Sequence, residues 1–319
     1  MQIFWVARVR PLLVTFELIL KKNTDNKEFD VDRDRSFEVG VVNIRVHTRH
    51  APEEYFALWK TLFRGKRIAI HSNTAIMIGE ARSTDKDDES APIVGSFYKF
   101  LNIDPSQTWF DIARKKKADE DDVSQISIPD YLKPNLTEVP YIFYPKKHRL
   151  YFVSKEGGSG HAAPRTIMRM LKRITEDRAV LDRFGKVDVT VVMERAKLEE
   201  IYRWKVIKRL ELVIERPNPL DYEDEEVMFE YLQGLGAESE QRVWKKARDS
   251  RTLQPDAQIK MLAVIASENG KVVASGLDDK LQKISVSSDN FPMMRRGKYS
   301  PNTQTLLGAL QDLVVKYFM

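Results

Sequence analysis

The 319-residue chain contains no cysteine. It can therefore form no disulfide bond, iron–sulfur cluster, zinc–thiolate site or cysteine nucleophile, and this absence agrees with a reducing compartment. Histidine is scarce, with five residues in all. His47 and His50 have H-x-x-H spacing without a surrounding H-E-x-x-H helix, and a metal site needs about three ligands with carboxylate support. We therefore expect neither a bound metal nor a cofactor.

The sequence also lacks a long uninterrupted apolar segment. Its most apolar stretch, residues 1–20, is broken by Arg8, Pro11 and Glu17, and no small-residue cleavage site follows it. A membrane-spanning helix needs about 20 mostly apolar residues, and a secretory signal needs such a cleavage site. We therefore expect a cytoplasmic protein without membrane insertion, in which residues 1–36 form an N-terminal extension.

The remaining composition suits a folded protein, since hydrophobic residues make up 42% of the chain and can bury a sizeable core. β-branched residues dominate 37–46, which predicts a strand, and a helix follows at 53–63. We predict the α+β class, with a β-rich α+β domain at 37–127 and a mixed α/β domain at 128–319. The other expected strands lie at 74–81, 93–103, 141–144, 149–153, 187–193, 206–215 and 271–274, and the other expected helices at 162–175, 196–202, 227–232, 238–251, 256–267 and 303–318.

Positive charge is concentrated in one part of the chain. Residues 144–186 contain eleven Lys and Arg against four Asp and Glu, a net charge of +7, whereas the whole chain carries +5. In the expected helix at 162–175, four bases fall on one stripe and apolar residues fall on the opposite face. The stripe consists of Arg165, Arg169, Lys172 and Arg173. Such a row can contact phosphates without reading sequence, and the alternative is an ordinary solvated helix face.

Two loops beside this helix extend the interpretation. Lys146, Lys147 and Arg149 form a neighbouring basic loop. A glycine-rich loop directly precedes the helix and could present backbone N–H groups to a phosphate, although a flexible connection explains the glycines equally well. It contains Gly157, Gly158, Ser159 and Gly160. Nucleic acid is therefore the expected partner.

Two other functions remain open. A metal-dependent nuclease would need acidic residues with a nearby lysine, and the best candidates are Asp188, Glu194 and Lys197, which ordinary surface positions also explain. An interaction scaffold could use the acidic block at 221–230 and the C-terminal helix at 303–318. No short catalytic motif is present, so we expect a binding protein rather than an enzyme.

Four segments, at residues 128–136, 143–151, 212–219 and 266–273, resemble a bacterial family known as domain of unknown function 4747, over a region from about Phe37 to near the C-terminus. The layout of the second half is also loosely similar to the Rex-type phage-exclusion sensors and the Kiwa anti-phage effector. That similarity implies a DNA-engaging protein of a phage-defence or mobile-element system and transfers no functional residue. A homodimer and a partner protein of a defence module are further interactions that the sequence leaves open.

Overall fold

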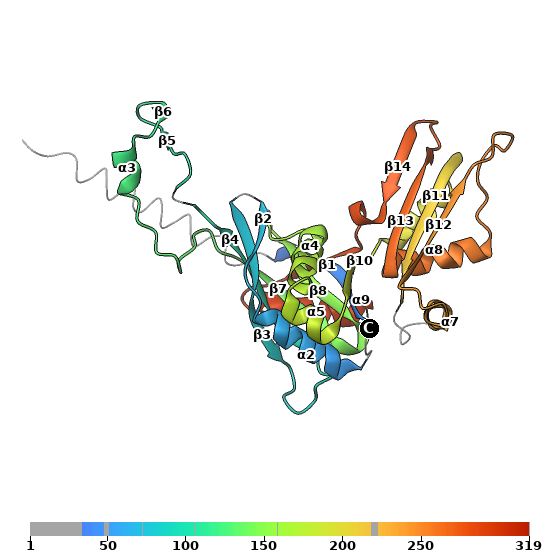
Figure 1. The fold of residues 1–319 in the computed structure, drawn as a ribbon, viewed down its shortest axis with the longest axis horizontal. Helices are drawn as coiled ribbons and strands as arrows, with labels where there is room; N and C mark the ends of the chain where they lie inside the picture. Colours follow the sequence, from blue (N-terminus) through green and yellow to red (C-terminus); the bar gives the residue numbers. More distant parts are fainter. Residues whose placement is uncertain are drawn as a thin grey trace, which may run out of the picture.

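The computed structural model describes residues 34–47, 51–71, 73–104, 106–157, 159–217 and 223–318. It confirms the α+β class: a large antiparallel sheet with helices on both faces is followed by a smaller sheet with its own helices (Figure 1). Residues 1–33 of the expected N-terminal extension lie outside the described residues. Among the helices that are described, none is long and apolar enough to cross a membrane.

The large sheet has nine strands in the order β10-β1-β8-β7-β4-β3-β2, with β15 pairing β1 and β9 pairing β8. Its strands are β1 (Arg35–Val46), β2 (Ile68–His71), β3 (Thr74–Ser83), β4 (Ile93–Leu101), β7 (Thr137–Tyr144), β8 (Arg149–Glu156), β9 (Ser159–Gly160), β10 (Val187–Val191) and β15 (Met294–Tyr299). The sheet takes strands from both sides of the boundary that we predicted between residues 127 and 128. That boundary does not separate two sheets, because β7, β8, β10 and β15 complete the sheet that β1 begins.

Strand β1 is central to this sheet, since β8 pairs one edge while β15 and β10 pair successive halves of the other. Alternate side chains of a strand point to opposite faces. Val42, Ile44 and Val46 belong to a core beneath three helices: α2 (Pro52–Phe63), α4 (Pro164–Thr175) and α5 (Arg178–Phe184). Val39 and Val41 belong to a core on the other face, beneath α9 (Leu306–Phe318).

The smaller sheet has the order β12-β11-β13-β14 and a separate apolar core. Its elements are α6 (Arg195–Tyr202), β11 (Val206–Glu215), α7 (Glu223–Gly234), β12 (Ser239–Lys245), α8 (Ala257–Asn269), β13 (Gly270–Leu277) and β14 (Lys283–Ser287). The helix predicted at 238–251 is wrong, because β12 occupies that place and pairs with β11 along its length. The side chains of β12 alternate between exposed and half-buried, as expected of an edge strand.

Shorter elements connect these units. They are β5 (Phe110–Asp111), β6 (Lys116–Lys117), α3 (Glu120–Ser124), η1 (Pro145–Lys147) and η2 (Ser288–Asn290). The first three form an arm that projects from the large sheet (Figure 1).

Trp59 on α2 provides a test of the core beneath the three helices. Its ring stacks on Phe143 at 4.6 Å between centroids, and its Nε1 donates a hydrogen bond of 3.0 Å to the hydroxyl of Tyr141. We expect Trp59→Phe to lower the free energy of unfolding by about 1–2 kcal/mol, because the hydrogen bond is lost and the smaller ring leaves space. Urea denaturation measures this change. The exposed Lys66→Ala serves as the control, and equal stability of the two variants would contradict the described packing.

Candidate functional site

Helix α4 presents its basic stripe to solvent, as the sequence predicts. Pro164 starts the helix, and residues such as Ile167, Leu171 and Ile174 are buried against the large sheet. The four stripe residues, Arg165, Arg169, Lys172 and Arg173, are all exposed. The helix contains no acidic residue, so nothing on its own surface neutralises the row.

The stripe makes few contacts within the protein. Arg165 Nη1 donates to Asn290 Oδ1 at 3.4 Å, and Arg173 Nη1 donates to the carbonyl of Ala69. Within the described residues, Arg169 and Lys172 have no hydrogen-bond or ion-pair partner through their side chains. These two side chains are therefore the most available for an external anion.

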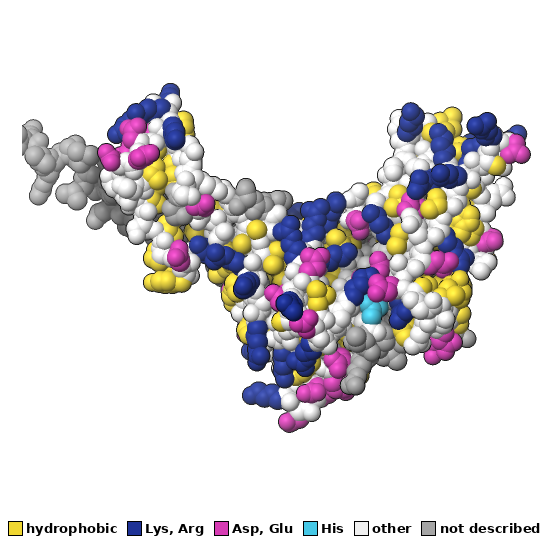
Figure 2. All heavy atoms as spheres, viewed as in Figure 1, with side chains coloured by type: hydrophobic (Ala, Val, Ile, Leu, Met, Phe, Trp, Pro, Cys, Tyr) yellow, Lys and Arg dark blue, Asp and Glu magenta, His cyan; other side chains and the backbone are white. Residues whose placement is uncertain are grey.

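Neighbouring helices enlarge the positive surface. α5 packs against both α2 and α4, so we define the basic layer as residues 52–67 and 164–186. This layer contains eleven Lys and Arg against five Asp and Glu, a net charge of +6. Figure 2 shows these side chains gathered over α4 and again near α2 and α5. The sequence alone does not predict the contribution of Lys60, Arg64, Lys66 and Arg67, because only the packing of α2 on α5 brings them there.

The glycine-rich loop before α4 forms part of a short hairpin. The N–H of Gly157 donates to the carbonyl of Ser36, and the N–H groups of His161 and Ala162 both donate to the carbonyl of Ser154. Gly160 lies on β9, which pairs with β8. Gly158 is outside the described residues. The three N–H groups are therefore directed at the protein's own carbonyls.

The nuclease candidates each have an ionic partner of their own. Asp188 Oδ2 lies 2.6 Å from His47 Nε2, Glu194 Oε2 lies 2.7 Å from Arg295 Nη1, and Lys197 Nζ lies 2.6 Å from Glu200 Oε1. The described part of the chain contains no group of three or more His, Asp or Glu side chains that could hold a metal ion. His50, the partner of His47 in the H-x-x-H spacing, lies outside it. Each of the three candidates thus contacts a different residue.

Asp188 instead belongs to a polar row that is buried on the α9 side of the large sheet. In the strand register Asp188 lies opposite Arg45, while Asn43 lies opposite both Thr190 and Arg149. Residues paired across antiparallel strands share a face. Arg45 is fully buried, and Asn43 is as well. On this face of the sheet, the side chains of β1 therefore change from apolar at Val41 to polar from Asn43 onward.

Helix α8 covers this polar row. Asn269 Oδ1 accepts hydrogen bonds from Asn43 Nδ2 at 2.9 Å and from Arg45 Nη1 at 3.0 Å, and the carbonyl of Glu268 accepts from Thr190 Oγ1 at 3.0 Å. The side chain of Asn269 also donates to Glu225 Oε1 on α7. The polar row thus joins the large sheet to the helices of the smaller unit.

The charges of this row alter the acidity of its carboxyl groups. Burial alone would raise the pKa of Asp188, but the hydrogen bond from His47 and the positive charges of Arg45 and Lys186 outweigh it and hold the pKa well below its usual range. Burial raises the pKa of Glu215, and the nearby charge of Asp188 raises it further. Asp188 is therefore ionised, and its negative charge offsets part of the cost of burying Arg45.

The basic loop predicted for DNA lies at a different place from the α4 stripe. Arg149 is only 9% exposed, and its Nη2 donates a 2.6 Å hydrogen bond to Glu268 Oε2. Arg195 Nη2 lies 3.8 Å from Glu268 Oε1. Lys147 Nζ donates to the carbonyl of Phe318 at 3.3 Å. The hydrogen bond to Phe318 places Lys147 at the end of α9. Both Lys147 and Arg149 therefore lie on the sheet face opposite α4.

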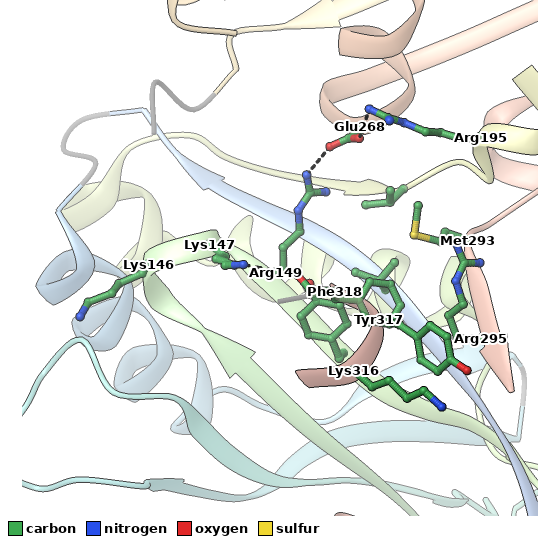
Figure 3. A pocket seen from close by; sticks show the side chains of 13 residues that line it. Lys146, Lys147, Arg149, Arg195, Glu268, Met293, Arg295, Lys316, Tyr317 and Phe318 are labelled. Carbon is green, nitrogen blue, oxygen red and sulfur yellow. Dashed lines mark hydrogen bonds and ion pairs between the residues drawn. The ribbon is translucent and has the colours of Figure 1, made fainter. Parts of the chain in front are cut away.

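A cavity of about 670 Å³ opens beside β1, between the C-terminal end of α9 and the C-terminal end of α8. We call it the basic cavity, because six bases and a single acid, Glu268, line it. Figure 3 shows Arg149 and Arg195 directed at Glu268 from two sides, with Tyr317 and Phe318 below them. The six bases are Lys146, Lys147, Arg149, Arg195, Arg295 and Lys316. The sequence alone does not predict this site, because its charged residues come from five separate segments.

Comparison with protein-family models places the chain in a family. The model of a family described as "Domain of unknown function (DUF4747)" matches residues 35–315, which include both sheets, the basic layer and most of the basic cavity. No curated protein matches the chain.

Proposed function

Since the chain belongs to the DUF4747 family, whose description gives no activity, we propose a function from the geometry: nonspecific DNA binding through the basic layer. The single observation that carries this proposal is the exposed stripe of α4, in which Arg169 and Lys172 have no ionic partner among the described residues. We further propose a place in a bacterial phage-defence or mobile-element system, a proposal that rests only on the resemblance of layout inferred from the sequence.

The size of the stripe suits a polyanion. From Arg165 to Arg173 the helix rises about 12 Å, at 1.5 Å per residue. Double-stranded DNA carries about one negative charge per 1.7 Å of its axis, so a duplex segment of this length carries about seven phosphate charges on its two strands. Arg and Lys contacts to phosphates give affinity without sequence readout. The basic layer would thus bind DNA of any sequence.

The salt dependence of binding tests the proposal. We expect the affinity for fluorescent double-stranded DNA to fall with a log–log slope of about −4 between 50 and 200 mM salt, because four stripe residues neutralising four phosphates give about −0.9 each. Fluorescence anisotropy at several salt concentrations measures the slope. Parallel titrations with single-stranded DNA and RNA establish which nucleic acid the layer prefers.

The same samples separate the alternatives. Intact substrate after incubation with Mg²⁺ agrees with a binding protein, whereas cleavage that is lost in both Asp188→Ala and Glu194→Ala would establish the nuclease. Absence of binding at 50 mM salt would overturn the DNA proposal. In that case the acidic helix α7, where Val227 and Tyr231 are exposed, becomes the first surface to examine for a protein partner.

A further inference from the structure

The basic cavity lies on the opposite face of the large sheet from the basic layer. Val41, Tyr151 and Val192 line it and belong to the core beneath α9, whereas α4 covers the other face. The geometry points to a second site in this cavity, which binds a free nucleotide: a small molecule that combines phosphate groups with a flat ring. This inference does not depend on the DNA proposal.

The charge of the cavity favours phosphate groups. Six bases surround one acid, and that acid already contacts Arg149 and Arg195. Lys147 and Lys316 have no acidic partner among the described residues, whereas the charge of Lys146 also acts on Asp88. Positive charges held together in a partly enclosed space repel one another, and a bound anion relieves that repulsion. A ligand with two or three phosphates would contact several of these lysines at once.

The aromatic lining favours a ring beside the phosphates. Tyr151 packs on Phe318 with 4.7 Å between ring centroids, and Tyr317 on the last turn of α9 is 51% exposed. Flat nucleobases stack on exposed aromatic side chains. Small-molecule sites enclose about 300–1,000 Å³, and the basic cavity at about 670 Å³ has room for one nucleotide. Inorganic phosphate would use the charges alone and leave the aromatic surface uncovered.

Glu268 acts as a positioning residue in this site. It holds the Arg149 guanidinium at 2.6 Å and lies 3.8 Å from that of Arg195. Its neighbour Asn269 accepts the hydrogen bonds from Asn43 and Arg45 that join the two units. A nucleotide in the cavity would therefore contact the large sheet through Arg149 and the smaller unit through Arg195.

Isothermal titration of the full chain with ATP, adenosine and inorganic pyrophosphate tests this inference. We expect ATP to bind at least tenfold more tightly than either of the other two, because only ATP supplies both phosphates and a ring. Equal affinity for pyrophosphate would overturn the role of the aromatic residues, and equal affinity for adenosine would overturn that of the lysines. No heat of binding at millimolar ATP would overturn the free nucleotide as the ligand of this cavity.

A matched pair of variants locates the ligand. Lys147→Ala/Lys316→Ala is expected to weaken ATP binding at least tenfold and to leave the affinity for double-stranded DNA within twofold. Arg169→Ala/Lys172→Ala on α4 should weaken DNA binding at least tenfold and leave the affinity for ATP within twofold. Melting temperatures show whether each variant is folded. An unchanged ATP affinity in a folded Lys147→Ala/Lys316→Ala would overturn the assignment.

The phosphates could also come from a nucleic-acid end. A 5′-phosphorylated oligonucleotide is therefore compared with its unphosphorylated form in the wild type and in Lys147→Ala/Lys316→Ala. Binding that requires the terminal phosphate and these two lysines, without any binding of ATP, would replace the free nucleotide by a nucleic-acid end.

Discussion

Asp188→Asn is expected to lower the free energy of unfolding by about 3–5 kcal/mol, because the buried positive charge of Arg45 loses the nearby negative charge of Asp188 that offsets its burial. Arg45 is fully buried opposite Asp188 in the register of β1 and β10. Burial lowers the pKa of Arg45, and the charge of Asp188 opposes that shift. Urea denaturation at neutral pH measures the loss.

Two control variants identify the cause. Asp182→Asn makes the same chemical change in the exposed pair with Arg178, whose atoms lie 3.5 Å apart, and should cost less than about 0.5 kcal/mol. Arg45→Met should cost less than Asp188→Asn, because Asp188 keeps His47 at 2.6 Å and Lys186 at 3.5 Å. A loss of unfolding free energy below about 1 kcal/mol in Asp188→Asn would contradict a structural role for Asp188. It would favour the hypothesis that Asp188 belongs to a nuclease site.

Acid titration separates the electrostatic from the steric cost. The pKa of Asp188 is depressed in the folded protein, so its stabilising contribution is complete above the unfolded value of about 4 and is lost as the pH falls below it. The difference between wild type and Asp188→Asn should therefore be largest near pH 7 and shrink steadily below about pH 4. A difference that is constant with pH would indicate a packing defect instead.

The second large effect concerns the basic layer. Arg169→Glu/Lys172→Glu should weaken binding of double-stranded DNA by about 100-fold or more at 0.1 M salt, because each lost phosphate contact costs about tenfold there, and should reduce the log–log salt slope by about 2. Both side chains are exposed and have no ionic partner within the described residues, so the melting temperature should change little. Fluorescence anisotropy and thermal denaturation measure the two quantities.

The matched control for this variant is Lys280→Glu/Lys283→Glu. These two exposed lysines lie beside and on β14 of the smaller sheet, and their reversal changes the net charge of the protein by the same amount. If the control loses as much affinity as the α4 variant, the binding reflects overall charge and the assignment to α4 is wrong. A large fall in the melting temperature of the α4 variant alone would indicate a structural role for the stripe.

Structural features that depend on residues close in sequence could be predicted correctly. Helix α4 was predicted within two residues of its observed limits and with the correct exposed side, because its apolar and basic residues repeat with the period of a helix. Strand β12 was misread because charged residues such as Glu240 and Arg242 suit a solvated helix. Its alternating exposure has meaning only once β11 lies beside it.

The polar row and the basic cavity depend on long-range pairing. Arg149 and Glu268 are 119 positions apart, and Asn43 and Asn269 are 226 positions apart. A single polar residue in a β-branched strand such as β1 reads as a solvent-facing position. Only the register that places Asn43 opposite Arg149 and Thr190 shows that this side is buried beneath α8.

The pairing of β1 by β15 has a consequence for synthesis of the chain. Residues 35–40 leave the ribosome long before their partners at 294–299 and the covering helix α9 do. Pairs so distant in sequence make folding slow, and an unpaired strand edge is prone to aggregation. A nascent chain that stalls after β14 would expose both the edge of Phe37–Gly40 and the apolar face beneath α9, and would be prone to aggregation until β15 and α9 emerge.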